Sequence, residues 1–144
     1  MRYLGIDYGT KRIGLSFADE LEVAYPLPPA VQKTLHERLS FIKTIINERK
    51  IEVLVVGYPY YLNGTKGKRI EEVEAFIKVL QKSCPLPIIK VDERLTTAKV
   101  EQDLKLFKQK SLSLSTLRNQ RKNGTLDSRA ATVILQDLLE QNRL

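Results

Sequence analysis

Three carboxylates stand where the sequence predicts chemistry: Asp7, Glu93 and Asp127. Asp7 follows the apolar segment 3–6, and Glu93 closely follows a second apolar segment at 87–91. Asp127 lies at or near the start of the last segment with helical periodicity. Ligands of open α/β sheets gather at the carboxyl ends of the strands. Two acids at strand ends and one at a helix start can therefore meet at one edge of a sheet.

The residue types favour hard metal ions over zinc. His36 is the only histidine and Cys84 the only cysteine, so the sequence has no zinc spacing. Crowded carboxylates repel one another unless a proton or a cation neutralises them, and oxygen ligands favour Mg²⁺ or Mn²⁺. Two such ions, about 3.5–4 Å apart, activate a water and stabilise the leaving oxygen in phosphodiester hydrolysis. The three acids therefore predict a metal-dependent nuclease.

Each acid also has a simpler structural interpretation. Asp7 could cap the amides of the turn that follows it. Glu93 could form a surface ion pair with Arg94, and Asp127 could be the N-cap of a helix. The residues taken singly leave these alternatives open, whereas their expected meeting at one sheet edge favours a shared site.

Positive charge is unevenly distributed along the chain. The net charge is +7, from 24 lysines and arginines against 17 acids. No acid lies between Asp103 and Asp127, and this stretch carries six basic residues: Lys105, Lys108, Lys110, Arg118, Arg121 and Lys122. A concentrated basic segment indicates a polyanion partner. The alternative is a solvated loop without a partner, and the composition of residues 108–124 predicts a mobile basic loop.

The elements that must position the three acids are read from hydrophobic periodicity. Three short strands with tight turns predict an antiparallel meander, ended by prolines: 2–7, 12–18 and 21–27, then Pro26, Pro28 and Pro29. Helices and strands then follow in the order 34–50 (helix, with a capping box from Thr34 to Glu37), 52–58 (strand), 67–83 (helix), 87–91 (strand), 97–107 (short helix) and 126–141 (helix). This order predicts an α/β fold with a five-stranded mixed sheet and helices on both faces.

Length and composition set the class of protein. A chain of 144 residues fits one domain, which we expect to span 1–144. No apolar run approaches the roughly 20 residues needed to cross a bilayer. An acid and a glycine come too early for a signal peptide, and a lone cysteine suits a reducing cytosol. We therefore expect a cytoplasmic protein with no membrane partner.

Four sequence blocks resemble the YqgF-type (RuvX-like) family, described as Holliday-junction resolvases and as nucleases that process the 5′ end of pre-16S ribosomal RNA. The resemblance covers nearly the whole chain. The blocks are GIDYGTKRIG at 5–14, VGYP at 56–59 with Gly64-Thr65, DERLTT at 92–97, and Asp127 followed by Ala130-Ala131. The first and third blocks are specific, and the order and spacing of the others agree with the family.

This resemblance implies an RNase H-like fold in which Asp7, Glu93 and Asp127 are the catalytic and metal-binding carboxylates. It further implies a cytoplasmic bacterial nuclease that uses Mg²⁺ or Mn²⁺. We expect contacts to nucleic acid from a set of turn and basic residues: Gly9, Thr10, Lys11, Arg12, Arg94 and Lys122. The sequence departs from the family pattern at two places. Tyr58, Tyr60 and Tyr61 replace smaller aliphatic or polar residues, which we expect to affect the substrate groove. Arg129 replaces an aliphatic residue near the start of the last helix.

The nuclease interpretation has three competitors. The first is a resolvase acting on branched DNA, and the second is a non-catalytic RNA-binding assembly factor. The third is nucleotide binding, because Asp-x-Gly-Thr after a first strand also resembles the phosphate motif of actin- and hexokinase-like ATPases. Those ATPases bind ATP between two such domains, and this chain has room for one. A symmetric junction would require a homodimer, whereas one site on an RNA end suits a monomer.

Overall fold

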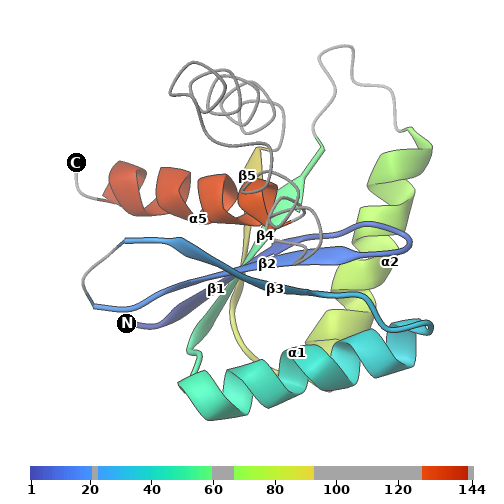
Figure 1. The fold of residues 1–144 in the computed structure, drawn as a ribbon. Coiled ribbons are helices and arrows are strands. Elements are labelled where there is room, and N and C mark those ends of the chain that lie inside the picture. The colour runs from blue at the N-terminus through green and yellow to red at the C-terminus, as the bar shows by residue number, and fades with distance from the viewer. Residues whose placement is uncertain (21–22, 60–66, 93–127, 143–144) are drawn as a thin grey trace, which may run out of the picture.

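The computed structural model describes residues 1–20, 23–59, 67–92 and 128–142 (Figure 1). Its elements in chain order are β1 (Tyr3–Asp7), β2 (Ile13–Ala18), β3 (Tyr25–Ala30), α1 (Leu35–Arg49), β4 (Val53–Tyr58), α2 (Lys68–Ser83), β5 (Ile88–Asp92) and α5 (Arg129–Asn142). The predicted short helix at 97–107 and the predicted basic loop at 108–124 lie outside the described residues.

The strands form one sheet in the order β3-β2-β1-β4-β5. The first three strands are an antiparallel meander, and β4 and β5 run parallel to β1. The predicted five-stranded mixed sheet is therefore confirmed. Since β1, β4 and β5 are parallel, their carboxyl ends lie at one edge of the sheet, with β1 at the centre.

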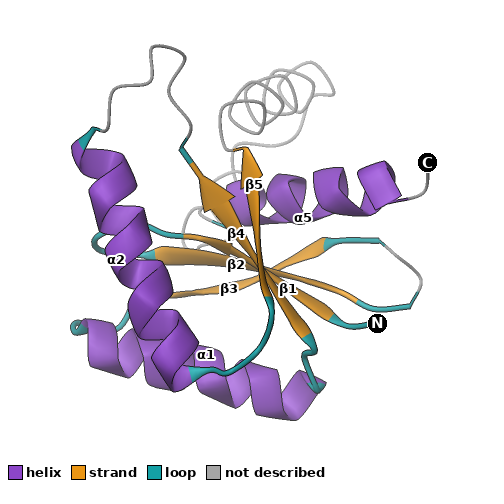
Figure 2. Cartoon of the chain, turned by 180° about the vertical axis from the view of Figure 1, so that it is seen from behind, coloured by secondary structure: helices purple, strands orange, loops and turns teal. Residues whose placement is uncertain are grey.

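Side chains alternate between the two faces of the sheet, and each face is covered by helices. Leu4, Ile6 and Val56 belong to the core that α1 and α2 complete. Val53 and Val55 belong to a second core completed by α5. Figures 1 and 2 show α1 and α2 together on one side of the sheet and α5 on the other. Helices on both faces, as predicted, are thus confirmed.

Helix α1 begins at the predicted capping box. Thr34 has extended backbone, and its hydroxyl accepts a hydrogen bond from the Glu37 amide at 3.1 Å. The same hydroxyl donates to Glu37 Oε1 at 3.1 Å. The pair satisfies an amide that the first turn of a helix leaves without an intrahelical partner.

The third strand was predicted wrongly in both position and end. It spans Tyr25–Ala30 instead of 21–27, and Pro26, Pro28 and Pro29 lie within it. Proline has no amide to donate, but β3 is an edge strand, so only one side of its backbone pairs with the sheet. The register with β2 also shifts between Ile13 and Leu15, opposite the proline pair. An edge strand with an irregular register tolerates prolines that a central strand would exclude.

Helix α5 packs unusually closely on the middle of the sheet, because Gly5 has no side chain. A Cβ added at Gly5 would overlap Ser16 Oγ and lie 2.8 Å from the carbonyl oxygen of Ala131. Two hydrogen bonds join α5 and β2 at this contact. The Ser16 hydroxyl donates to the Ala131 carbonyl at 2.7 Å, and the Leu15 amide donates to Ser128 Oγ at 3.1 Å. Both serines are fully buried.

This packing predicts that Gly5→Ala destabilises the fold. We expect the free energy of unfolding to fall by about 1–3 kcal/mol, because the added methyl group must push α5 away from the sheet. Urea denaturation measures the change. Ser40→Ala, at an exposed position of α1, is the control and should change stability by less than about 0.5 kcal/mol. Equal stability of the two variants would contradict the prediction.

Candidate active site

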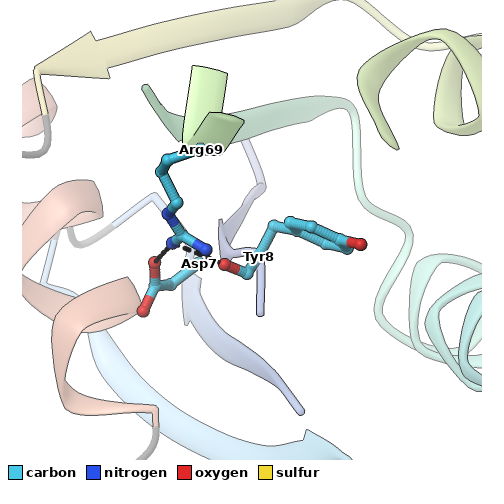
Figure 3. Close-up of polar contacts among 3 residues, drawn as sticks. All are labelled: Asp7, Tyr8 and Arg69. Carbon is cyan, nitrogen blue, oxygen red and sulfur yellow. Dashed lines mark hydrogen bonds and ion pairs between the residues drawn. The ribbon is translucent and has the colours of Figure 1, made fainter. Parts of the chain in front are cut away.

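Asp7 is the last residue of β1, the central strand, and pairs with Gly14 of β2. Its side chain is 22% exposed, and its Oδ1 atom is buried. Strand alternation places Asp7 on the same face as Gly5, which is the face covered by α5. The next residue, Tyr8, has its ring stacked on Phe76 of α2, with 4.5 Å between ring centroids. In Figure 3 the Asp7 carboxylate and the Tyr8 ring accordingly point away from each other.

Arg69, in the first turn of α2, connects to the end of β1. Its Nη2 atom donates to the Tyr8 carbonyl oxygen at 2.7 Å and lies 3.8 Å from Asp7 Oδ1 (Figure 3). An ion pair of that length, with the arginine side chain 34% exposed, contributes little free energy. Arg69 therefore offsets only part of the charge of Asp7. A carboxylate with a buried oxygen atom is suited to act as a ligand of a cation.

The turn after β1 carries four of the residues predicted to contact nucleic acid: Gly9, Thr10, Lys11 and Arg12. The side chains of the last three are exposed. A Cβ at Gly9 would lie 2.5 Å from the Arg12 carbonyl oxygen, so the tight turn requires glycine there. The turn directly follows Asp7 and lies at the same sheet edge. The other two predicted contacts, Arg94 and Lys122, lie outside the described residues.

Helix α5 begins beside Asp7. Ser128, directly before its first residue, accepts from the amide of Leu15, and Leu15 is the register partner of Ile6. Ala131, further along, lies against Gly5. The helix therefore points its N-terminus toward the carboxyl end of β1, and a helix N-terminus carries partial positive charge. The predicted helix start at 126 and the site residue Asp127 lie outside the described residues, and α5 itself begins at Arg129.

Asp92 is the last residue of β5. It is the register partner of Tyr58, whose side chain belongs to the core formed with α1 and α2. Lys90, two residues earlier, lies 4.9 Å from the Tyr58 ring on that same face. Asp92 and Asp7 therefore lie on opposite faces of the sheet. Glu93, the next residue and the predicted ligand, lies outside the described residues.

Tyr58, one of the tyrosines expected to affect the substrate groove, lies in the core formed with α1 and α2. Its side chain is buried and its hydroxyl donates to Glu74 of α2. The other two tyrosines of that expectation, Tyr60 and Tyr61, lie outside the described residues.

Two arginines near the site were missed by the sequence analysis. Arg69 carries no sequence signal that separates it from other helix-surface arginines. Arg38 does, because it shares the apolar face of α1 with Leu35, Leu39 and Ile42. It is buried, and its Nη1 atom donates to the Thr10 carbonyl oxygen at 2.8 Å. A basic residue in a helix's apolar stripe indicates a specific polar contact.

Asp7 is the one member of the predicted acidic triad that the described ranges include. Among those ranges, no three histidine, cysteine or acidic side chains gather as a metal site. None of the helices described is both long enough and apolar enough to span a bilayer.

Two solved structures of proteins bound to Holliday-junction substrates share this fold. A fowlpox virus resolvase in complex with substrate Holliday junction DNA superposes with a TM-score of 0.57 at 14% identity, over 99% of each chain. T. thermophilus RuvC in complex with a Holliday junction substrate gives a TM-score of 0.55 at 15% identity, over 99% of this chain and 96% of that one. At these identities the likeness concerns the fold, which is RNase H-like as predicted.

Sequence comparison is more specific. A protein of Opitutus terrae named "Putative pre-16S rRNA nuclease" is 41% identical over 142 residues, covering 98% of this chain and 92% of its own. The family described as "RuvX: Holliday junction resolvase" matches residues 1–141. The chain therefore belongs to the RuvX family.

Proposed function

We propose that this protein is a metal-dependent nuclease that hydrolyses phosphodiester bonds in structured nucleic acid. Asp7, Glu93 and Asp127 are its catalytic, metal-binding carboxylates. The observation that carries the proposal is the position of Asp7, at the end of the central strand and beside the N-terminus of α5. A carboxylate at this position can bind a hard metal ion such as Mg²⁺ without a histidine or cysteine ligand.

The geometry around Asp7 supports the choice of its two partners. Ser128 contacts the sheet at the level of Ile6, one residue before Asp7. Asp127 directly precedes Ser128 in the sequence. Asp92 is the register partner of Tyr58 and lies on the face opposite to Asp7. Glu93 is the next acid in the sequence. Both considerations favour the acids that the family resemblance implies.

The three carboxylates would hold Mg²⁺ or Mn²⁺, which would activate a water and stabilise the leaving oxygen. The chain's own residues bind and orient the substrate. Lys11 and Arg12 expose positive charge in the turn that follows Asp7 and would attract the phosphate backbone. Arg69 lies 3.8 Å from the Asp7 carboxylate on the α2 side.

We take the 5′ end of pre-16S ribosomal RNA as the substrate, with the protein acting as a monomer in the cytoplasm during ribosome biogenesis. A relative with 41% identity over nearly the full length is named a pre-16S rRNA nuclease. The second candidate is resolution of branched DNA by a homodimer, favoured by the family description. The resolvase structures support the fold alone, because their identity to this chain is at most 15%.

Removing a carboxylate of the triad should abolish cleavage while preserving binding. We expect Asp7→Asn, Glu93→Gln and Asp127→Asn each to lower the cleavage rate by about 100-fold or more, because loss of a metal ligand removes several kcal/mol of transition-state stabilisation. Single-turnover cleavage and gel-shift assays on a pre-16S RNA fragment measure the two properties.

Asp92→Asn is the matched control for these variants, since it changes a carboxylate at the same sheet edge but on the opposite face. It should cleave at close to the wild-type rate. Full activity of Asp7→Asn, or equal loss in Asp92→Asn, would refute the assignment of the site.

Metal removal should stop the reaction without unfolding the protein. We expect EDTA to abolish cleavage, Mg²⁺ or Mn²⁺ to restore it, and Zn²⁺ to restore little, because the predicted ligands are hard oxygens. Circular dichroism should be unchanged by EDTA, since the two hydrophobic cores form without these ligands. Undiminished cleavage in EDTA would rule out the metal-dependent mechanism.

A cleavage assay identifies the substrate if it compares a pre-16S RNA fragment, a four-way DNA junction and linear duplex controls. Light scattering on the same protein measures its oligomeric state. We expect a monomer that cleaves the RNA at its 5′ side and leaves the junction intact. Symmetric junction cleavage by a dimer would instead establish the resolvase function. Tight RNA binding without turnover under either metal would identify a non-catalytic assembly factor.

A further inference from the structure

The turn between β1 and β2 carries two exposed cations and accepts a hydrogen bond from a buried one. The side chains of Lys11 and Arg12 are exposed. From helix α1, Arg38 Nη1 donates to the Thr10 carbonyl oxygen at 2.8 Å. Arg38 therefore contacts the backbone directly before the two exposed cations.

Arg38 lies in an apolar environment that does not explain its charge. It is 8% exposed, and its neighbours on the same face of α1, Leu39 and Ile42, belong to the core. Its Nε atom is buried and meets no acceptor, and no acidic side chain among the described residues pairs with it. Burial of a cation without a charge partner costs free energy. The hydrogen bond to the turn, and not a contribution to stability, is therefore the better reason for an arginine at this position.

The turn has little conformational freedom, so this one hydrogen bond affects the whole of it. Its ends are held by the sheet, where Asp7 and Gly14 are register partners. Within it, a Cβ at Gly9 would lie 2.5 Å from the Arg12 carbonyl oxygen, so the backbone folds back tightly on itself. A backbone restrained at Thr10 also restrains the directions in which the side chains that follow leave the turn.

Cations on a turn that is already ordered bind phosphate better than cations on a mobile one. Lysine and arginine lose more side-chain entropy than most residues when they are immobilised. A turn already held in place avoids the additional cost of ordering the backbone, which improves affinity without any new contact. Loss of the restraint should therefore weaken binding to a polyanion even though both exposed cations remain.

We propose that Arg38 is a positioning residue for substrate binding: it holds the turn so that Lys11 and Arg12 contact the phosphate backbone. The inference rests on the proposed function, because it concerns binding of the same nucleic-acid substrate. Arg38 itself is buried and contacts the peptide group of Thr10, not the substrate. The ligand class is the nucleic-acid phosphodiester, which such side chains contact without regard to base sequence.

Binding of a pre-16S RNA fragment, measured by fluorescence anisotropy in EDTA, tests the proposal without cleavage. In Arg38→Met we expect Kd to rise about fivefold, because the turn must then be ordered on binding. The urea midpoint should stay at or above the wild-type value, since methionine removes the buried charge and keeps an unbranched side chain. A lowered midpoint with an unchanged Kd would show that Arg38 is structural only, and would overturn the proposal.

A double-mutant cycle shows whether Arg38 acts through the two exposed cations. Together, Lys11→Met and Arg12→Met should raise Kd about tenfold at about 0.1 M salt, since two phosphate contacts are lost. Adding Arg38→Met should then change Kd by less than about twofold, because the cations that it positions are already absent. An additive result, with Kd raised about fiftyfold in all, would mean that Arg38 acts independently of them and would overturn the proposal.

Arg49→Met is the matched control. It also removes an arginine of α1, but Arg49 donates to the Tyr25 hydroxyl at 3.0 Å, away from the turn. This variant should bind with the wild-type Kd. A loss equal to that of Arg38→Met would attribute the effect to net charge and would overturn the proposal.

Gly9→Ala tests the proposal even if Arg38→Met fails to fold. The added Cβ perturbs the turn and leaves Arg38 in place, so Kd should rise about as much as in Arg38→Met. A wild-type Kd for Gly9→Ala would show that the conformation of the turn does not matter for binding, and would overturn the proposal.

Because binding is measured without metal, these outcomes do not depend on cleavage. If the wild-type protein binds the RNA but does not cleave it with Mg²⁺ or Mn²⁺, the proposed nuclease function fails and the Kd values alone decide this inference. If the wild-type protein cleaves the RNA while Arg38→Met and Gly9→Ala bind it as tightly, the inference fails and the nuclease function stands.

Discussion

The close packing of α5 against β1 and β2 is the contact on which the candidate site depends. It exists because Gly5 has no side chain and because Ser16 and Ser128 satisfy polar groups that the contact buries. These interactions fix the position of the helix along the strand as well as its distance from it. The N-terminus of α5 thereby stays at the end of β1, next to Asp7.

The opposite face of the sheet supports the same strand end by different means. There, Arg38 and Arg69 donate to backbone carbonyls, and the Tyr8 ring stacks on Phe76. A short turn after a strand is often mobile. This turn is held by both covering helices. A functional group is positioned better when rigid elements restrain its neighbours from both sides.

The sequence predicted those parts of the fold that local patterns determine. Apolar segments and the Thr34 capping box located the sheet and α1, and the end of an apolar segment located Asp7. Local patterns could not predict that β3 would be an edge strand tolerating three prolines, because edge position is a property of the whole sheet. They also could not predict Arg69, whose contact with Asp7 joins residues 62 positions apart in the sequence.

Charge around the strand end argues that Asp7 does not act alone. Arg69 lies 3.8 Å from its carboxylate, Arg38 is buried behind the adjoining turn, and Lys11 is exposed on it. One carboxylate among three cationic side chains is too little negative charge to attract a divalent ion strongly, since each positive neighbour opposes binding. Further acids must contribute, and Asp92 lies on the opposite face. The positive surroundings therefore suit the phosphate backbone, and the proposed metal binding would need Glu93 and Asp127 to join Asp7.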